Sequence, residues 1–156
     1  MSVTEQLAQL LIKNKLTIST AESCTGGLVS SKLTDVAGSS AYITHNVITY
    51  ANSVKHNILG VSSLILEEKG AVSPECAEEM ARGLYKLTGS DICLATTGIA
   101  GPDGGSPEKP VGLCYVGLYY KNNVKIKKLL FDSSLTRIHL KELFANAALE
   151  FVIENL

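Results

Sequence analysis

The sequence lacks any run of about 18 consecutive apolar residues, the minimum length of most membrane-spanning helices. Its first residues, MSVTEQLAQLLIKNK, also lack the charged start and the cleavage site of a secretory signal peptide. Neither sign of charge is in excess, because 14 Lys and Arg residues nearly balance 15 Asp and Glu residues. We therefore expect a cytoplasmic protein that binds neither a membrane nor a nucleic acid.

No two of the four cysteines have the CxxC spacing that is typical of zinc sites and redox-active pairs, so the sequence predicts no metal site. Cys93 and Cys114 lie in apolar runs that resemble β-strands, and we expect both to be small buried hydrophobic residues. The histidines His45, His56 and His139 are isolated, with no acidic partner evident beside them. A histidine-based catalytic pair is therefore not indicated.

A chain of 156 residues without an internal repeat or a linker fits one domain, residues 1–156. Hydrophobic spacing and capping residues predict helices over residues 3–14, 26–33, 52–60 and 73–87. They also predict a short helix that begins at Ser62 or Ser63 and a last helix from Ser134 or Thr136 to the C-terminus. The same reasoning predicts strands over residues 16–21, 43–50, 91–97, 111–120 and 124–131. Asn52 or Ser53 is the expected cap of the third helix. The last helix is expected to direct these side chains into the core: Ile138, Leu143, Phe144, Ala147, Phe151 and Val152.

Helices and strands alternate over the first two thirds of the chain, and the last two strands form an expected hairpin around residues 122–123. This order predicts an α/β fold, a three-layer α/β/α sandwich with a mixed sheet. Ligands of such folds gather where strands end and helices begin. Two glycine-rich stretches, residues 22–27 and 98–110, follow predicted strands and are expected at that edge.

The stretch 19-STAESCTGGLVSSKL-33 places hydroxyl and thiol groups at a strand-to-helix turn. Backbone N–H groups of residues 24–27 would be free there to stabilise an oxyanion or a phosphate. Ser23 and Cys24 are both candidate nucleophiles. The alternative is that Ser23 or Thr25 simply caps the helix.

A serine nucleophile needs a base, and a buried lysine with a lowered pKa is one option. The segment 50-YANSVK-55 puts Tyr50 at a strand end and Lys55 in the next helix, where both could face the same crevice. The pattern 106-SPEK-109 matches the SxxK motif of penicillin-binding enzymes, but that motif requires a helix and this segment is rich in proline. The glycines of 98-GIAGPDG-104 have the spacing GxxGxxG, which differs from the dinucleotide-binding pattern.

Five motifs, in unbroken order along nearly the whole chain, resemble those of the CinA C-terminal domain family: 21-AESCTGG-27, 38-GSSAY-42, 50-YANSVK-55, 70-GAVS-73 and 97-TGIAGPDGGSPEKPVG-112. This family includes stand-alone nicotinamide-nucleotide amidases. The resemblance implies a three-layer α/β/α domain and hydrolysis of nicotinamide mononucleotide to nicotinic acid mononucleotide and ammonia. It also implies that no metal or cofactor is needed. A homo-oligomer is possible.

The resemblance assigns the catalytic roles to Ser23 as nucleophile, Lys55 as base and Tyr50 beside them. Expected substrate-binding residues are Cys24, Thr25, Gly26, Gly27, Ser39, Asn52, Thr97, Gly98, Gly101 and Arg137. The loop over residues 98–105 is expected to cover the ribose or the phosphate.

One segment, 131-FDSSLTRIHLK-141, departs from the family pattern. Amidases of this family carry Gly-Asp-Arg followed by a second arginine. Leu135 and His139 stand at the two expected arginine positions, and Arg137 is two residues out of register. The departure motivates an alternative function, a non-catalytic module that binds a nucleotide or a protein.

Overall fold

The computed structural model describes residues 1–156. The helices are α1 (Val3–Asn14), α2 (Leu28–Thr34), α3 (Asn52–Leu59), α4 (Ser63–Glu68), α5 (Pro74–Thr88) and α6 (Arg137–Glu154). The strands are β1 (Ile18–Glu22), β2 (Ile43–Ile48), β3 (Ile92–Gly98), β4 (Leu113–Tyr120) and β5 (Asn123–Leu130). A short 3₁₀ helix, η1 (Ser39–Ala41), precedes β2.

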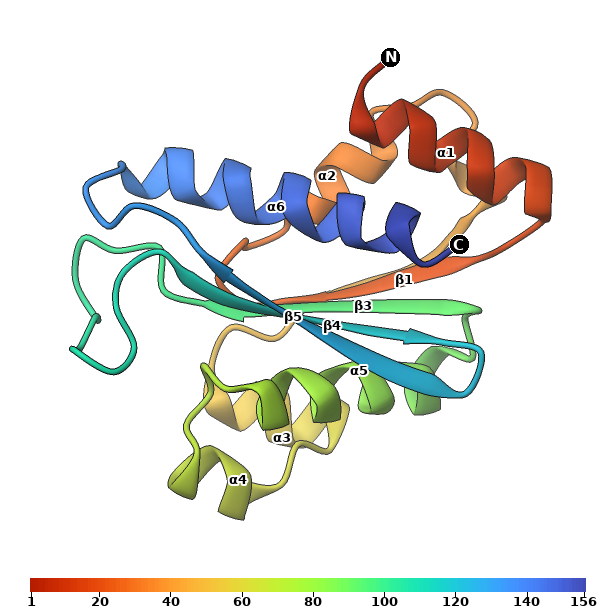
Figure 1. The fold of residues 1–156 in the computed structure, drawn as a ribbon. Coiled ribbons are helices and arrows are strands. Elements are labelled where there is room, and N and C mark those ends of the chain that lie inside the picture. Colours follow the sequence, from red (N-terminus) through yellow and green to blue (C-terminus); the bar gives the residue numbers. More distant parts are fainter.

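The five strands form one mixed sheet in the order β2-β1-β3-β4-β5. Strand β1 pairs in parallel with both β2 and β3, whereas β3–β4 and β4–β5 are antiparallel. Helices α1, α2 and α6 cover one face of the sheet, and α3, α4 and α5 cover the other (Figure 1). The expected three-layer α/β/α sandwich with a mixed sheet is therefore confirmed.

Each face of the sheet has its own hydrophobic core. The cluster beneath α1, α2 and α6 contains 22 buried residues, and the cluster on the α3 and α5 side contains 10. Helix α5 lies unusually close to its neighbours, because a Cβ atom at Gly83 would be 1.8 Å from the Leu59 carbonyl oxygen. A Cβ at Gly117 of β4 would likewise be 2.4 Å from the Ala77 oxygen. Glycine is therefore required at both contacts.

The predicted elements all exist, and their ends differ by only a few residues from those expected. The hairpin turn lies one residue earlier than predicted, at Lys121 and Asn122, whose φ angles of 52° and 61° suit a tight two-residue turn. The expectation that Asn52 or Ser53 caps α3 was wrong. Ala51 occupies the cap position, and it makes no side-chain cap bond.

Ile138 was expected in the core but is 81% exposed. The buried side of α6 instead passes through Leu140, Phe144, Ala148 and Val152, whose spacing of four residues keeps them on one side of the helix. Ile138 lies two residues before Leu140 and therefore projects from the opposite side. None of the helices is both long enough and apolar enough to cross a membrane.

The residues of the candidate site lie at one edge of the sheet. Strands β1, β2 and β3 end there, and β4 begins and β5 ends at the same edge because they run antiparallel. The glycine-rich loop between β3 and β4 and the first turn of α6 project at this edge (Figure 1). Segments that are far apart in the sequence therefore meet where parallel strands end, as expected for ligand sites of α/β folds.

Candidate functional site: a buried serine–lysine pair

Ser23 and Lys55 are in direct contact. The Nζ atom of Lys55 lies 2.9 Å from Ser23 Oγ and 2.6 Å from the carbonyl oxygen of Tyr50. Ser23 follows the last residue of β1, and Lys55 lies one turn into α3, so the two elements bring the side chains together from either side of the sheet edge. Only 8% of Ser23 and 1% of Lys55 are exposed to solvent. The predicted nucleophile and base are thus within hydrogen-bond reach.

The surroundings of Lys55 favour its neutral form. Burial lowers the pKa of Lys55, because the interior solvates an ammonium group poorly. The thiols of Cys76 and Cys24 act in the opposite direction on that pKa. Burial raises the pKa of Cys76 to about 11, so this thiol carries no charge near neutral pH. No carboxylate forms a salt bridge with Lys55, and a neutral amine can accept a proton.

Neither Ser23 nor Thr25 caps α2. The cap residue is Gly27, whose φ angle of 107° strongly favours glycine, and it has no side-chain cap bond. The carboxylate of Glu22 performs the capping, because Oε1 accepts from the N–H of Val29 at 2.8 Å and Oε2 from the N–H of Ser30 at 2.9 Å. The alternative of a simple serine or threonine cap is therefore wrong.

The turn between β1 and α2 retains free backbone donors. The N–H of Gly26 bonds to the Ser23 carbonyl oxygen at 3.1 Å and closes the turn, so it is not available as expected. The N–H groups of Cys24, Thr25 and Gly27 make no hydrogen bond within the protein. These three groups belong to the turn that carries Ser23, and each is free to donate to the oxygen atom of a ligand.

Tyr50, Gly101 and Arg137 form a second contact group at the same edge. The guanidinium of Arg137 donates to the Gly101 carbonyl oxygen at 2.6 Å and to the Tyr50 hydroxyl at 3.2 Å. Arg137 is the first residue of α6, as expected from the sequence. The backbone carbonyl of Tyr50 therefore contacts Lys55, while the residue as a whole is 58% exposed and its hydroxyl contacts the arginine.

Lys141 is a candidate that the sequence analysis missed. Its Nζ atom would lie 3.7 Å from a Cβ atom at Gly26, and it forms no salt bridge. Arg137 and Lys141 are four residues apart, which is also the spacing between Leu135 and His139, the two expected arginine positions. Leu135 packs against the hydrophobic core and has no charge with which to bind an anion. The two cations therefore occur two residues later than the family pattern predicts.

The other predicted binding residues differ in which atoms they leave free for a ligand. Cys24 is buried with its Sγ 3.8 Å from Cys114 Sγ, so it can contribute only its backbone. Thr97 uses its hydroxyl to bond the Ala71 carbonyl oxygen at 2.8 Å, and Gly98 packs against β4 too closely for a side chain. Asn52 is exposed in the first turn of α3 and makes no hydrogen bond to Lys55.

Ser39 is not brought to the site. It lies just before β2, and β2 runs parallel to β1 with Ile43 opposite Ile18. Ser39 is therefore at the edge of the sheet where the parallel strands begin, whereas Ser23 is at the edge where they end. Within this chain, the structure therefore does not bring Ser39 to the serine–lysine pair.

Thr49 was also missed. Its side chain is 0% exposed, and its Oγ1 is the only buried side-chain nitrogen or oxygen atom without a hydrogen-bond partner. The backbone N–H of Thr49 bonds to the Glu22 carbonyl oxygen at 2.8 Å, one step beyond the Glu22–Ile48 pair. Continuation of this register sets Thr49 beside Ser23 on the neighbouring strand.

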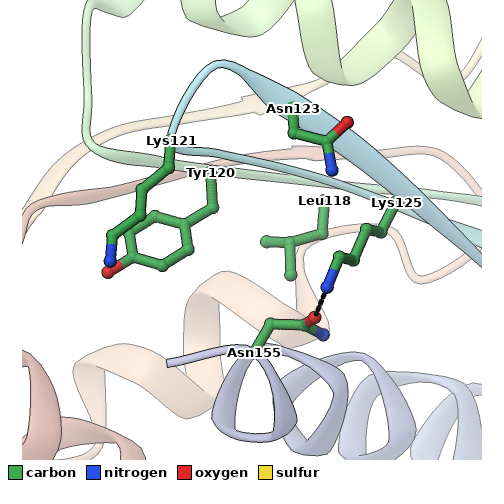
Figure 2. A pocket seen from close by; sticks show the side chains of 6 residues that line it. All are labelled: Leu118, Tyr120, Lys121, Asn123, Lys125 and Asn155. Carbon is green, nitrogen blue, oxygen red and sulfur yellow. Dashed lines mark hydrogen bonds between the residues drawn. The ribbon is translucent and has the colours of Figure 1, made fainter.

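Of the hollows on the surface, one lies far from the candidate site and another borders the glycine-rich loop. A cavity of about 250 Å³ at the far end of the β4–β5 hairpin is lined by six residues, including Lys121, Lys125 and Asn155, and none of them is a candidate site residue (Figure 2). A more open hollow of about 570 Å³ runs along the glycine-rich loop, residues 102–111, next to the loop segment that Arg137 holds. No cluster of three or more His, Cys, Asp or Glu residues could hold a metal ion.

These contacts define a class of protein. It is an α/β/α sandwich that carries a buried serine–lysine pair at the edge where its parallel strands end. Residues 1–156 match the model of the CinA C-terminal domain, and the chain belongs to this family. The recognition made from the five sequence motifs is thereby confirmed. A CinA-like protein of Kosmotoga olearia is 50% identical over 151 residues, which cover 97% of this chain and 36% of the relative.

Solved structures agree with this assignment. The crystal structure of the competence/damage inducible protein CihA from Agrobacterium tumefaciens has a TM-score of 0.92 at 39% identity and covers 99% of this chain and 96% of its own. A CinA superfamily protein from Escherichia coli has a TM-score of 0.93 at 31% identity, with coverage of 99% and 88%. The chain spans only about a third of the length of the curated relatives it matches.

Proposed function

We propose that this protein is an amidohydrolase that converts nicotinamide mononucleotide to nicotinic acid mononucleotide and ammonia. The observation that carries the proposal is the 2.9 Å contact between Ser23 Oγ and a buried Lys55 whose pKa is lowered by burial. A neutral lysine beside a serine hydroxyl is the arrangement that activates a weak nucleophile without a histidine. The identity of the proposed substrate comes from the resemblance to the CinA C-terminal domain family.

In the proposed reaction, Lys55 takes the hydroxyl proton of Ser23 while Oγ attacks the carbon of the carboxamide. The carbonyl oxygen becomes an oxyanion, which the free N–H groups of Cys24, Thr25 and Gly27 can stabilise. The C–N bond then breaks, and the leaving nitrogen takes the proton from Lys55 as ammonia is released. Water, deprotonated by the same lysine, hydrolyses the acyl-enzyme and restores Ser23.

Arg137 and Lys141 are the proposed partners of the substrate phosphate. Both are cationic and lie one helical turn apart on α6. Arg137 contacts Tyr50 and Gly101, and Lys141 lies near Gly26 in the turn that follows β1. The hollow along the glycine-rich loop begins next to Gly101, whose carbonyl oxygen Arg137 contacts, and we assign it to the ribose and the phosphate. The contact between Ser23 and Lys55 favours the amidase over the alternative, a non-catalytic module that binds a nucleotide or a protein.

The test is ammonia release from nicotinamide mononucleotide by the purified parent protein and by Ser23→Ala. We expect the alanine variant to lose at least about 10³-fold in kcat, since a missing nucleophile usually lowers the rate by orders of magnitude. Cys24→Ala is the matched control, because it removes the adjacent thiol and retains the backbone donor. Turnover by Ser23→Ala within about tenfold of the parent, or no turnover by the parent, would contradict the proposal.

A further inference from the structure

Glu22 is a buried carboxylate that the proposed reaction does not use. It is 1% exposed, and its two oxygens accept four hydrogen bonds from three residues. Besides the N–H groups of Val29 and Ser30, the donors are the hydroxyl of Thr25 at 2.6 Å and the hydroxyl of Ser30 at 2.6 Å. Every contact is a donor, which suits a carboxylate that accepts through both oxygens.

The bond from Thr25 connects this carboxylate to the turn that carries the nucleophile. Thr25 Oγ1 also lies 2.9 Å from Thr96 Oγ1 on β3, so one hydroxyl joins the turn to both Glu22 and the neighbouring strand. The backbone N–H of Ser23 bonds to the carbonyl oxygen of the same Thr96 at 3.1 Å. The beginning and the middle of the turn are therefore fixed to β3, and Glu22 fixes the middle to α2.

Glu22 also determines where an anion can bind near Ser23. The N-terminus of α2 would attract an oxyanion or a phosphate, but its Val29 and Ser30 N–H groups already bond to the carboxylate. The donors left for an incoming oxygen are the N–H groups of the turn itself. The geometry of that turn, rather than the helix terminus, must then be correct for catalysis.

From these contacts we propose that Glu22 is a positioning residue that acts through Thr25 and holds Ser23 and its neighbouring N–H groups in register with Lys55. The inference rests on the proposed function. Neither side chain touches the reacting atoms, so the effect of losing them is a misplaced nucleophile. A misplacement of about 1 Å in an active site can lower the rate on the order of 100-fold.

The variants that test this role are Glu22→Gln, Thr25→Val and Thr25→Ser. Glutamine keeps the shape of Glu22 but replaces one acceptor oxygen with an NH₂ group, which faces donors. Valine removes the linking hydroxyl, and serine restores it. We expect kcat to fall between about 10- and 100-fold for the first two variants, KM to stay within about twofold, and Thr25→Ser to recover most of the loss.

Ser19→Ala is the matched control. Ser19 is another buried hydroxyl of β1, and it contacts Thr88 Oγ1 at 3.0 Å and Cys93 Sγ at 3.4 Å without touching Glu22 or any of its donors. We expect a similar loss of stability but a kcat within about twofold of the parent. If Glu22→Gln or Thr25→Val is folded and has parental kcat, or if Ser19→Ala loses as much rate as they do, Glu22 is only a structural cap and the proposal is overturned.

A second readout separates this inference from the proposed function. If the parent releases no ammonia from nicotinamide mononucleotide, the amidase proposal fails by itself. Crystal structures of the parent and of Thr25→Val then decide the role of Glu22. We expect the Ser23 Oγ–Lys55 Nζ separation to increase from 2.9 Å beyond hydrogen-bond reach in the variant. An unchanged contact would overturn the positioning role.

Discussion

Glu22 and Lys55 lie on either side of Ser23, and both side chains are almost completely buried. The carboxylate of Glu22 faces α2, where four donors satisfy its oxygens. Lys55 lies on the α3 side, where its nitrogen meets one hydroxyl and one carbonyl oxygen and no carboxylate. Hydrogen bonds take the place of water around a buried polar group, and where they are few, burial disfavours the charged form.

The difference assigns separate tasks to two neighbouring positions. The carboxylate of Glu22 can fix a backbone turn because it accepts several directional hydrogen bonds from the protein. The poorly solvated lysine can accept a proton because burial lowers its pKa. Four predictions would break or sharpen this comparison.

The largest effect is expected from Lys55→Arg and Lys55→Met. A guanidinium cannot give up its proton at accessible pH, and methionine has no basic group, so we expect kcat to fall at least about 10³-fold in both. Methionine should also raise the free energy of unfolding, because it removes a buried amine without a carboxylate partner. Ammonia release and urea unfolding measure the two effects. An active Lys55→Arg enzyme would remove lysine from the mechanism.

Stability should depend on pH through the same lysine. Its pKa in the folded protein lies below the ordinary value of 10.5, so the unfolded chain binds more protons between those two values. The free energy of unfolding should therefore rise with pH across that window, by at most about 1.4 kcal/mol per pH unit. Urea unfolding of the parent and of Lys55→Met at several pH values isolates this contribution, since the other groups cancel in the difference. If the free energies of unfolding of the two proteins change with pH in parallel, burial does not lower the pKa of Lys55.

The α6 cations are expected to have a smaller effect that is confined to binding. In the proposed complex, Arg137 and Lys141 bind the substrate phosphate. We expect Arg137→Ala and Lys141→Ala each to raise KM for nicotinamide mononucleotide about tenfold, with little change for the riboside that lacks the phosphate. Ile138→Ala is the control, since Ile138 lies between them on α6 and is exposed. Equal effects on both substrates would contradict a phosphate contact.

The smallest effect is expected from Thr49→Val. The Thr49 hydroxyl has no partner, so an apolar side chain of the same shape should raise the free energy of unfolding by up to about 1 kcal/mol. Thr20→Val should have the opposite sign, because the Thr20 hydroxyl is bonded on both sides. Thermal unfolding of the two variants measures the contrast. Destabilisation of Thr49→Val would mean that its hydroxyl has an unrecognised partner.

Much of the fold follows from local patterns in the sequence. Ser73 and Pro74 begin α5 as expected, since serine accepts from the Cys76 N–H and proline needs no donor at the first helical position. The buried face of α6 was predicted less well, because its apolar and small residues surround the helix and Ile138 gave no local sign of exposure. Which side of such a helix is buried depends on how it docks on the sheet.

The candidate site was predictable to the extent that it repeats family motifs. Ser23 and Lys55 were identified from those motifs, and the structure brings them together. Glu22 stood within the same motif, but its role depends on donors seven and eight residues away on α2. Lys141 and Thr49 depend on helix docking and strand register, which no short segment encodes. The place of Ser39 was not predictable, because a motif match does not reveal which edge of the sheet its residue occupies.

The close contacts of α5 have a consequence for genetics. Gly83 and Gly117 leave no room for even a methyl group, although neither residue is near Ser23. A loss-of-function screen would therefore recover substitutions at these glycines alongside substitutions of the serine and lysine. The two kinds of mutant would differ in cellular abundance, since a glycine mutant should be degraded while a Ser23→Ala mutant accumulates to the parental level. A map of essential positions for this chain must consequently be read together with protein levels before any residue is assigned to chemistry.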